Sequence, residues 1–427
     1  MPPSPRRRRL APALAPVRRL GATRQDVLMD DPSTTPPRGP LAGCLVADFS
    51  RVLAGPLATM LLGDLGATVV KVEHPHGDDT RQWGPPFKGA ESTYFLSVNR
   101  NKRSVVLDLT TPEGAADARS LAERATVLVE NFRPGRLARF GLGYEQLAAA
   151  NPGLVYCSIS GFGGAGTPGA DLAGYDFVVQ AMAGLMDITG PEGGPPTKVG
   201  VAVVDVLTGL HAAVGILAAL GARHESGRGQ LVEVNLMSSA LASLVNQASA
   251  YLNAGTVPRA MGNRHPSIAP YETLAAKDGA LAVAVGNDGQ FRLLCTAIGD
   301  GGLADDERFS TNPARVAHRD QLVRHLESLL TTRPAAEWVD VLRAAGVPCG
   351  PVNDVAAAFA DAERLGLDPV VEQPSGDGGD VRSVASPLVL SASPVTYRRP
   401  PPPIGRDTEE VLAWLRTPAP GAPLDPA

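Results

Sequence analysis

The sequence predicts an α/β protein whose large domain has a mainly parallel sheet and whose second, smaller domain is α+β. From residue 43 onward, short apolar segments of strand length alternate with segments of helix length, the order found in βαβ units. The strand segments are continuous apolar runs, which is typical of parallel strands buried on both faces. Further along, two strand-like segments joined by Lys277 and Asp278 read as an antiparallel pair, which indicates a second domain.

The first half of the chain supplies the strands of the predicted sheet, which we expect at 44–50, 68–73, 104–109, 126–131 and 154–160. A helix over 54–67 separates the first two, and Pro56 suits its first turn. Thr111 and Pro112 predict the N-cap and first position of the next helix. Helical patterns over 174–184 and from about Val203 to His224 precede a further strand at 231–236.

The second half is expected to begin with one helix over 238–255, a loop over 256–270 and the strand pair at 271–276 and 279–285. Helices follow at 315–330 and 335–345, and Asp407 is predicted to cap the last helix after a proline-rich connector. The expected division is a disordered Arg/Pro-rich tail over 1–40, the large domain over 41–236, a linker helix over 237–262, the small domain over 263–352, a segment returning to the large domain over 353–416, and a disordered tail over 417–427.

Composition excludes two classes of protein. The 427 residues are 44% hydrophobic and 19% charged, which is typical of a soluble globular chain. The longest apolar region, 199–222, contains Asp205, His211 and several glycines, so it lacks the roughly 18 clean residues of a membrane span. Residues 1–28 carry a net charge of +6, which leaves about −11 on the rest of a chain of net charge −5. An acidic body argues against nucleic acid as a partner, and we expect no membrane partner.

The Arg-rich N-terminal segment and the cysteines bear on localisation. Two prolines break the segment and it has no apolar core of signal-peptide type. It reads as a disordered tail or an over-extended start, with Met29 as the beginning, or alternatively as a transit peptide to the mitochondrial matrix. The four cysteines form no C-x-x-C pair and suit a reducing compartment, which favours the cytoplasm.

Two motifs are ambiguous. The run "GFGGAG" over 161–166 matches a dinucleotide-binding pattern by its letters, but "TPGADLAG" follows it where a helix should begin, so we favour a flexible glycine loop. The run "KVEHPHGDD" brings Glu73, His74, His76, Asp78 and Asp79 together, yet spacing fixes no third metal ligand and we expect no metal.

Two basic clusters flank predicted strands of the sheet and could hold phosphates through bidentate arginine contacts, or could simply be solvated surface. They comprise Arg100, Lys102 and Arg103, and further along Arg133, Arg136 and Arg139.

Asp205 is an acid in the apolar start of the helix predicted from Val203, and spacing leaves two interpretations open. A carboxylate at a helix N-terminus can cap free N–H groups and favourably meet the helix dipole. Alternatively, those N–H groups and the dipole keep the carboxylate ionised at neutral pH in a half-buried pocket, where it can act as a nucleophile.

Several ordered motifs resemble family III CoA-transferases of the CaiB/BaiF type, from about Leu41 to Leu415. They are "DFSRVLAGPLATMLLGDLGATVVKVEHPHGDDTRQWGPP", "NRNKRSVVLDL", "VENFRPGRLARFGLGYE", "AGYDFVVQAMAGLMDITG" and "DVLTGLHAAVGILAAL". The second of these, with the residues before it, and "GLMDITGPEGG" are most similar to the succinyl-CoA:glutarate, or dicarboxylate, branch. The resemblance implies a Rossmann-like large domain, an interlocked homodimer, no permanently bound cofactor, and acyl-CoA and a small carboxylic acid as substrates.

The resemblance also implies a mechanism and a set of site residues. Asp205 would be the nucleophile and would carry CoA as an aspartyl thioester. CoA would contact Leu53, Ala54, His74, Leu107, Asp108, Leu109, Thr110, Asn131, Phe132, Arg133, Arg139, Leu172, Ala173, Gly174 and Tyr175. Relatives with Arg at the His74 position have a fixed charge there, whereas His is largely neutral at pH 7.

Substrate choice is the least constrained feature. The loop "MGNRHPS" stands where formate-type relatives have a run of glycines, and we expect Arg264 and His265 to hold the distal carboxylate of a dicarboxylic acyl group. Succinyl-CoA is the expected donor and glutarate the expected acceptor, with malate, citramalate, itaconate and larger acids open. Alternatives are an α-methylacyl-CoA racemase, disfavoured because its second base would be Tyr175 here, and a non-catalytic acyl-CoA-binding protein.

Overall fold

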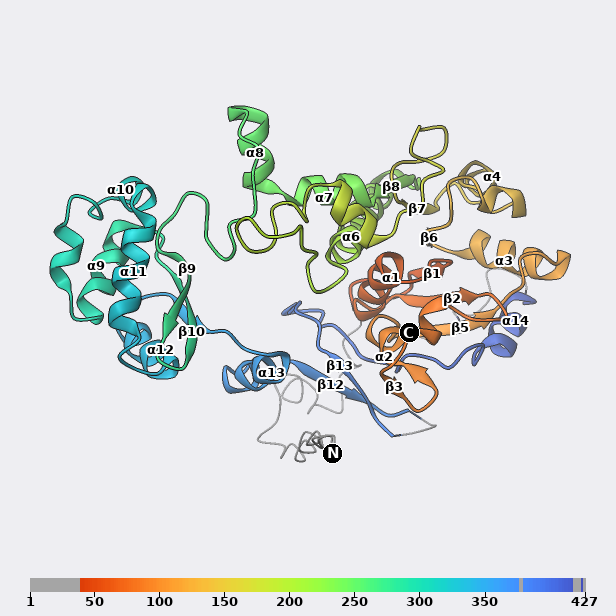
Figure 1. Cartoon of the computed structure of the whole chain (residues 1–427). Helices are drawn as coiled ribbons and strands as arrows, with labels where there is room; N and C mark the ends of the chain where they lie inside the picture. The colour runs from red at the N-terminus through yellow and green to blue at the C-terminus, as the bar shows by residue number, and fades with distance from the viewer. Residues whose placement is uncertain (1–38, 376–378, 418–423, 425–427) are drawn as a thin grey trace, which may run out of the picture.

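The computed structural model describes residues 39–375, 379–417 and 424 and has two lobes joined by extended segments (Figure 1). The predicted tail over 1–40 lies almost wholly outside these residues, as does most of 417–427. Each lobe has its own cluster of buried apolar residues. The exact domain boundaries stay a prediction.

A six-stranded parallel sheet forms the centre of the larger lobe, in the order β5-β2-β1-β6-β7-β8. Its strands are β1 (Leu45–Asp48), β2 (Thr68–Glu73), β5 (Lys102–Val106), β6 (Val127–Glu130), β7 (Val155–Ser160) and β8 (Leu231–Asn235). Counted along the chain within this sheet, the order is 3-2-1-4-5-6, that of doubly wound dinucleotide-binding folds. The connection reverses direction between β1 and β6, so that pair marks the point where such sheets bind ligands.

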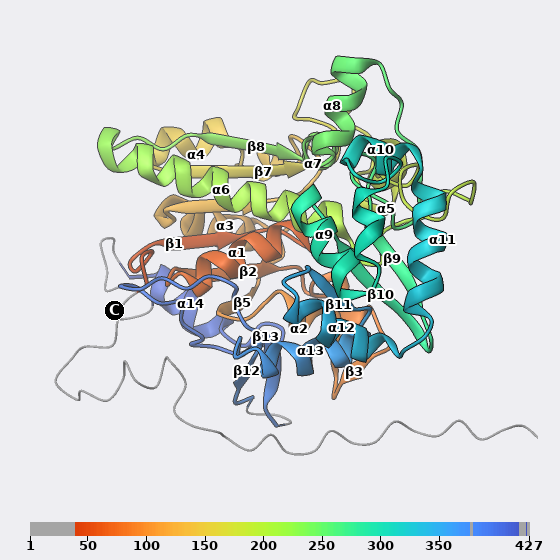
Figure 2. The ribbon, with the colours of Figure 1, turned by 90° about the vertical axis from the view of Figure 1, so that its left-hand side faces the viewer.

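Helices cover both faces of the sheet (Figure 2). One face carries α1 (Ala54–Asp64), α5 (Asp176–Met182), α6 (Val203–Ser226) and α7 (Leu236–Ser243); the other carries α3 (Pro112–Arg124), α4 (Tyr144–Ala150) and α14 (Thr408–Leu415). Successive side chains of a strand point to opposite faces, so Val46 belongs to the first core and Ala47 to the second. Thr111 caps α3 by accepting the Gly114 N–H, as predicted.

Helix α6 packs closely on α1 because of one glycine. A Cβ at Gly209 would come within 2.6 Å of the Ala54 carbonyl oxygen, so only glycine lets the two helices approach this far. By length and composition alone α6 could cross a membrane, but its buried face packs on α1, β7 and β8 as that of a core helix. Its other face exposes Leu210, Val214 and Leu217.

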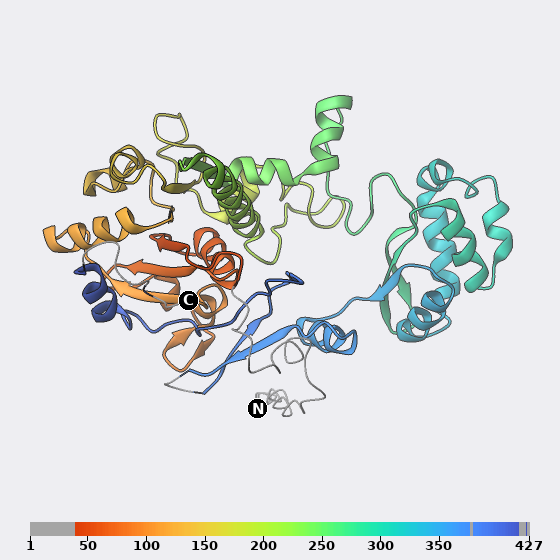
Figure 3. The same ribbon diagram turned by 180° about the vertical axis from the view of Figure 1, so that it is seen from behind.

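The smaller lobe is an antiparallel sheet covered by helices (Figure 3). The sheet comprises β9 (Tyr271–Ala276), β10 (Gly279–Ala284) and β11 (Cys349–Pro351), with Lys277 and Asp278 in the predicted turn. The helices are α9 (Asp288–Ala297), α10 (Asn312–Ala317), α11 (Arg319–Leu330) and α12 (Ala335–Ala344), with a 3-10 turn η4 (Gly301–Asp305).

The remaining elements connect or complete the lobes. They are the 3-10 turns η2 (Asp79–Gln82) and η3 (Leu137–Phe140), the hairpin strands β3 (Phe87–Lys88) and β4 (Glu91–Ser92), α2 (Thr93–Ser97), α8 (Val245–Ala254), α13 (Val355–Arg364), β12 (Val370–Gln373) and β13 (Val381–Val384). The chain after β13 runs back along the larger lobe to α14 beside β5.

Three predictions about helices are wrong in detail. The helix expected over 238–255 is two helices, because the chain bends between α7 and α8 where Val245 has a φ of 44°. The helix expected over 315–330 is likewise divided into α10 and α11 at His318. Asp407 stands at the N-cap of α14 without capping it: its carboxylate instead accepts the Ser104 N–H at 2.9 Å and pairs with Arg103, which joins the C-terminal segment to β5.

Candidate active site

A cavity of about 460 Å³ opens at the carboxyl ends of the parallel strands. The loop between β1 and α1 and the segment after β6 form two of its walls, so it lies at the point where the strand order reverses. Further walls come from the segments after β2, β5 and β7, and from the residues just before α5. This position is the one that the fold offers to a nucleotide-like ligand.

The cavity brings together nearly all of the residues expected to contact CoA. The lining includes Leu53, Ala54, His74, Leu107, Asp108, Leu109, Thr110, Asn131, Phe132, Arg133, Leu172, Ala173, Gly174 and Tyr175, and also Asp205. Arg139 is not among them: it lies on η3, whereas Arg136, just before that turn, lines the cavity wall. Arg264 and His265 belong to the smaller lobe's loop and also lie outside this lining.

Asp205 lies in the first turn of α6, but it does not cap that helix. The capping carboxylate is that of Asp176, whose Oδ1 accepts the backbone N–H groups of Val204 at 2.8 Å and of Asp205 at 3.3 Å. Gln180 in turn donates to Asp176 Oδ2 at 2.7 Å and accepts the Val199 N–H at 2.9 Å. Among the described residues, no hydrogen bond to the Asp205 side chain is found, so its carboxylate oxygens are available to a ligand.

The environment of Asp205 raises the pKa of its carboxyl to about 7, through burial first and the nearby Asp176 charge second. Two expectations are therefore corrected: the side chain is not the helix cap, and the helix end does not hold it fully ionised at neutral pH. The N–H groups that would stabilise its charge are occupied by Asp176, whose own charge opposes ionisation. A carboxylate with a pKa near 7 is both protonated and ionised at neutral pH, and its ionised form is the more nucleophilic.

The two basic clusters lie in different environments: residues of one line the cavity, and the other is buried in ion pairs. Arg133 and Arg136 line the cavity, together with Arg51, whose guanidinium lies 5.4 Å from the centre of the Phe132 ring. Three guanidinium groups at one cavity can accommodate phosphates. The other cluster is buried and paired instead: Arg100 with Asp64, Lys102 with Asp48, and Arg103 with Asp407 and Glu410. Its alternative reading as a phosphate cradle is wrong, since these cations join elements of the fold.

The run "KVEHPHGDD" is used for ion pairs and loop geometry. Glu73 pairs with Arg81 at 2.7 Å, Asp78 with Lys71 at 2.8 Å, and Asp79 with Arg51 at 3.2 Å. Among the described residues, no group of three or more candidate ligands could hold a metal ion. His74 lines the cavity, and its Nδ1 lies 3.2 Å from the His76 N–H that donates to it, so the Nε2 of the neutral ring carries the proton.

The glycine-rich segment over 161–166 begins no helix, in agreement with the rejection of a dinucleotide motif. Gly161 instead meets Gly174 backbone to backbone: a Cβ on Gly161 would lie 2.5 Å from the Gly174 Cα. Both glycines line the cavity. The close approach brings the residues before α5 over the end of β7, which places Tyr175 at the cavity.

Arg264 is surrounded by carboxylates in the structure. Its guanidinium lies 3.1 Å from Asp320, 3.4 Å from Glu272 and 3.4 Å from Glu192, and 31% of its side chain is exposed. His265 Nδ1 accepts the Ser267 N–H at 3.1 Å, and its ring packs on Tyr271. The loop is thus tied by ion pairs to both lobes.

Sequence reasoning missed Asp176, Gln180 and Arg51 as parts of the site. Asp176 directly follows Tyr175, but no local pattern links it to a helix that begins 27 residues later. The Arg51 position follows a buried strand, which was a usable signal, because loops at the carboxyl ends of parallel strands line such sites.

Comparisons with known proteins agree with this arrangement. The succinate–glutarate CoA-transferase of Agrobacterium fabrum is 45% identical over 398 residues, covering 91% of this chain and 98% of that protein. The succinyl-CoA:glutarate CoA-transferase of Mus musculus is 43% identical, covering 87% of this chain and 86% of that protein. The crystal structure of a CaiB/BaiF family protein from Brucella suis superimposes with a TM-score of 0.79 at 43% identity, covering 88% of this chain and all of the other.

The family model described as CoA-transferase family III matches residues 41–408, a span that includes every wall of the cavity and Asp205. With the doubly wound sheet, the cavity at its reversal point and relatives above 40% identity over most of the length, the chain belongs to CoA-transferase family III.

Proposed function

We propose that this enzyme transfers CoA from succinyl-CoA to a dicarboxylate such as glutarate, with Asp205 as the group that carries CoA. The observation that carries the proposal is a carboxylate in the cavity wall with no hydrogen bond from the described residues to its side chain. The names of the relatives from Agrobacterium fabrum and Mus musculus support the pair of substrates.

The reaction proceeds through acyl and thioester intermediates on one carboxylate. The ionised Asp205 attacks the thioester carbonyl of succinyl-CoA, which forms a mixed anhydride and releases CoA as thiolate. The thiolate then attacks the Asp205 carbonyl, which releases succinate and leaves an aspartyl-CoA thioester. The acceptor carboxylate attacks this thioester to form a second anhydride, and the released thiolate collects the acyl group and restores Asp205. Each transfer is a simple acyl exchange in place of one difficult displacement.

In this proposal, particular residues of the cavity wall hold particular parts of CoA. Arg51, Arg133 and Arg136 supply positive charge for phosphates, and the Nε2–H of neutral His74 is a further donor. The apolar residues Leu53, Leu107, Leu109 and Leu172 and the ring of Phe132 offer surface to the adenine and the pantetheine chain. Arg139 remains in this proposal as a cation at the outer rim.

The acceptor's distal carboxylate is assigned to Arg264, with His265 beside it. Since Arg264 already faces Glu192, Glu272 and Asp320, an acceptor carboxylate would replace one of these partners. Exposed Glu192 and Asp320 can exchange with solvent at little cost, unlike buried Glu272.

The working unit in this proposal is a homodimer in the cytoplasm. Large apolar side chains are exposed on consecutive elements of the larger lobe, namely Phe177, Met182, Val214, Leu241, Val245, Tyr251 and Leu252. Large exposed apolar side chains in such number are unusual for a monomer, and a second copy of the chain would cover them. The family resemblance implies that the two copies interlock.

The deciding experiment assays the purified full chain with succinyl-CoA and glutarate and follows glutaryl-CoA by mass spectrometry. Asp205→Asn should lose turnover, whereas the control Asp340→Asn, a change of an exposed carboxylate on α12, should retain it. Incubation with succinyl-CoA and hydroxylamine should convert Asp205 into a hydroxamate, detectable by peptide mapping. A protein that binds CoA but forms neither glutaryl-CoA nor the hydroxamate would be a non-catalytic binder and would contradict the proposal.

A further inference from the structure

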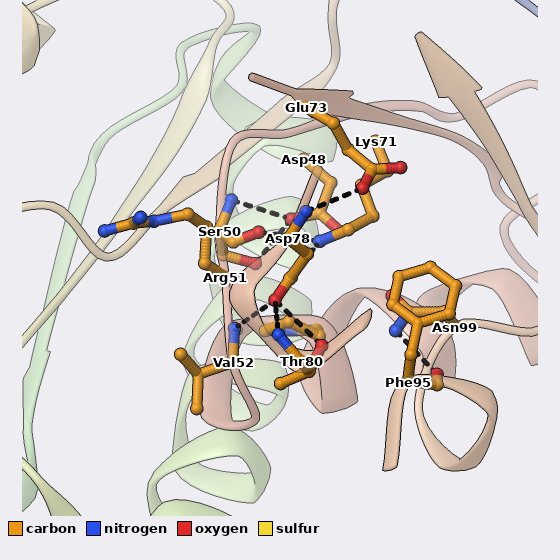
Figure 4. A network of polar contacts seen from close by, with 12 residues as sticks. Asp48, Ser50, Arg51, Val52, Lys71, Glu73, Asp78, Thr80, Phe95 and Asn99 are labelled. Carbon is orange, nitrogen blue, oxygen red and sulfur yellow. Dashed lines mark hydrogen bonds and ion pairs between the residues drawn. The ribbon is translucent and has the colours of Figure 1, made fainter. Parts of the chain in front are cut away.

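A fully buried ion pair lies beneath the loop between β1 and α1 (Figure 4). Lys71, inside β2, and Asp78, in the loop after β2, have side chains with 0% exposure, and Lys71 Nζ lies 2.8 Å from Asp78 Oδ2. Removing two charges from water is costly, and their mutual attraction returns little net stability. The pair therefore adds little to the stability of the fold, and its other contacts are what distinguish it.

Both members of the pair hold the backbone of one short loop. Lys71 Nζ donates to the Ser50 carbonyl oxygen at 2.9 Å, and Asp78 Oδ1 accepts the Val52 N–H at 3.4 Å. Between these two contacts, Asn131 holds Arg51 in both directions, accepting its N–H at 2.8 Å and donating to its carbonyl at 2.7 Å. Three consecutive residues are thus fixed by side chains from β2, from the loop after it and from the end of β6.

The residue at the end of this grip has a strained backbone. Val52 has a φ of 70°, a left-handed conformation that is an outlier for a β-branched residue. Such a conformation is unfavourable and persists only where the surroundings determine it. The contacts to Ser50, Arg51 and Val52 are part of those surroundings, together with the Asp48 carboxylate, which accepts the Ser50 N–H at 3.0 Å.

The strained residue lies in the wall of the cavity. Arg51, Val52 and Leu53 all line it, and Leu53 is the N-cap residue of α1. If Val52 relaxed to a negative φ, the peptide planes on both sides would rotate and the flanking side chains would leave the wall. A change in the backbone conformation of this loop would therefore change the shape of the cavity.

We infer that the Lys71–Asp78 pair is a positioning device: by gripping Ser50 and Val52 it keeps Val52 left-handed and so sets the wall formed by Arg51, Val52 and Leu53. The inference rests on the proposed function only for the identity of the ligand, an acyl-CoA. Neither Lys71 nor Asp78 lines the cavity, so they act through the loop and do not touch the ligand.

The test first removes the ion pair that holds the loop, and then replaces Val52 by a residue that needs no such support. Lys71→Met/Asp78→Leu replaces the pair by apolar side chains of similar size. Arg100→Met/Asp64→Leu is the matched control, since that pair is also buried, with a 2.6 Å contact, but lies outside the cavity wall. Adding Val52→Gly to the first variant supplies a residue that adopts positive φ without strain. A milder variant, Lys71→Met/Asp78→Asn, keeps an oxygen for the Val52 N–H if the apolar pair impairs folding.

The readouts are the dissociation constant of CoA by calorimetry, KM and kcat with succinyl-CoA, and the unfolding temperature. We expect the variant lacking Lys71–Asp78 to lose roughly 10- to 100-fold in kcat/KM through misplacement of the wall. The loss should fall mainly on KM and on CoA affinity, and Val52→Gly should recover most of it. The control variant should not show this loss of affinity, whatever its unfolding temperature.

Two results would overturn the inference: CoA affinity equal to that of the control pair in a folded variant, or no recovery on adding glycine. Measurements on the parent enzyme distinguish a failure of this inference from a failure of the proposed function. If the parent chain neither bound CoA nor turned over succinyl-CoA, the proposed function would fail before any variant was made.

Discussion

Asp176 Oδ1 accepts the backbone N–H of Asp205 at 3.3 Å, so the Asp176 carboxylate occupies the helix end beside the Asp205 side chain. The two acids have separate tasks as a result. Asp176 caps α6 and is held by Gln180, whereas the Asp205 carboxyl has a pKa raised to about 7. The helix N-terminus thus fixes the position of the Asp205 side chain more than it promotes its charge.

A first prediction concerns the pH dependence of Asp205. Because its pKa is raised, the carboxyl is protonated and unreactive below about pH 7, and kcat/KM should rise with pH through that value. Asp176→Asn keeps an oxygen for the two N–H groups but removes the neighbouring charge, so the rising limb should move to lower pH. Burial, the larger cause, remains, so the limb should not return to the pH of a free aspartate.

The measurement is kcat/KM for succinyl-CoA between pH 5 and 9 for the parent, Asp176→Asn and the Asp340→Asn control. A rising limb that stays in place in Asp176→Asn, or moves to higher pH, would show that the Asp176 charge does not act on Asp205.

A second prediction concerns stability and Glu130, which lies at the end of β6 with 5% exposure. Burial raises the pKa of its carboxyl to about 7, although Ser158 and the Phe132 N–H donate to it. The folded state therefore binds more protons than the unfolded chain between about pH 4.5 and 7, and stability from this group falls as pH rises through that window.

Glu130→Gln removes this titration and can still pair with both neighbours. The unfolding free energy of the parent should fall between pH 5 and pH 8, whereas that of the variant should not. The difference, variant minus parent, should therefore increase by about 2 kcal/mol from pH 5 to pH 8. Denaturant unfolding at the two values measures it, with the exposed Glu337→Gln as control. A difference that is the same at both values for Glu130→Gln would show that the buried group does not titrate in this range.

Local sequence patterns were sufficient for most of the fold. The continuous apolar runs predicted β2 at its observed bounds and the other strands of the parallel sheet within a few residues, and Thr111 caps α3 as its spacing indicated. The patterns failed where tertiary contacts decide: Val245 bends one expected helix into two, and Asp407 pairs with β5 instead of capping α14.

For the candidate site as well, local motifs predicted some features and missed those that depend on tertiary contacts. All the residues that the family motifs implied as CoA contacts, except Arg139, line the cavity, and many of them follow the ends of the parallel strands. The motifs did not reveal that Asp176 takes the helix end, or that Arg100, Lys102 and Arg103 are buried in ion pairs. Both facts depend on contacts between segments far apart in the chain, which local spacing does not encode.

A third prediction concerns the acceptor and Arg264. If this guanidinium holds a distal carboxylate, Arg264→Ala should raise KM for glutarate about tenfold or more, the loss expected for a charge-assisted hydrogen bond. The KM of Arg264→Lys for glutarate should lie between those of the parent and Arg264→Ala, because lysine keeps the charge but lacks the planar guanidinium. Arg259→Ala is the control, since Arg259 also pairs with the segment over 187–192, through Asp187. An unchanged KM for glutarate in Arg264→Ala would remove this role.

A last prediction separates CoA transfer from α-proton chemistry. A racemase needs a base that takes the proton from the α-carbon, and at the position in question this chain has Tyr175, whose side chain lies at the cavity with 61% exposure. A phenol is protonated at neutral pH and is a poor base for that step. We therefore expect no deuterium uptake when a 2-methylacyl-CoA is incubated with the enzyme in D2O, under conditions in which succinyl-CoA and glutarate are converted. Mass spectrometry of the recovered thioester measures this directly. Deuterium at the α-carbon that Asp205→Asn abolishes would instead assign the carboxylate to proton transfer, because acyl exchange alone leaves every C–H bond intact.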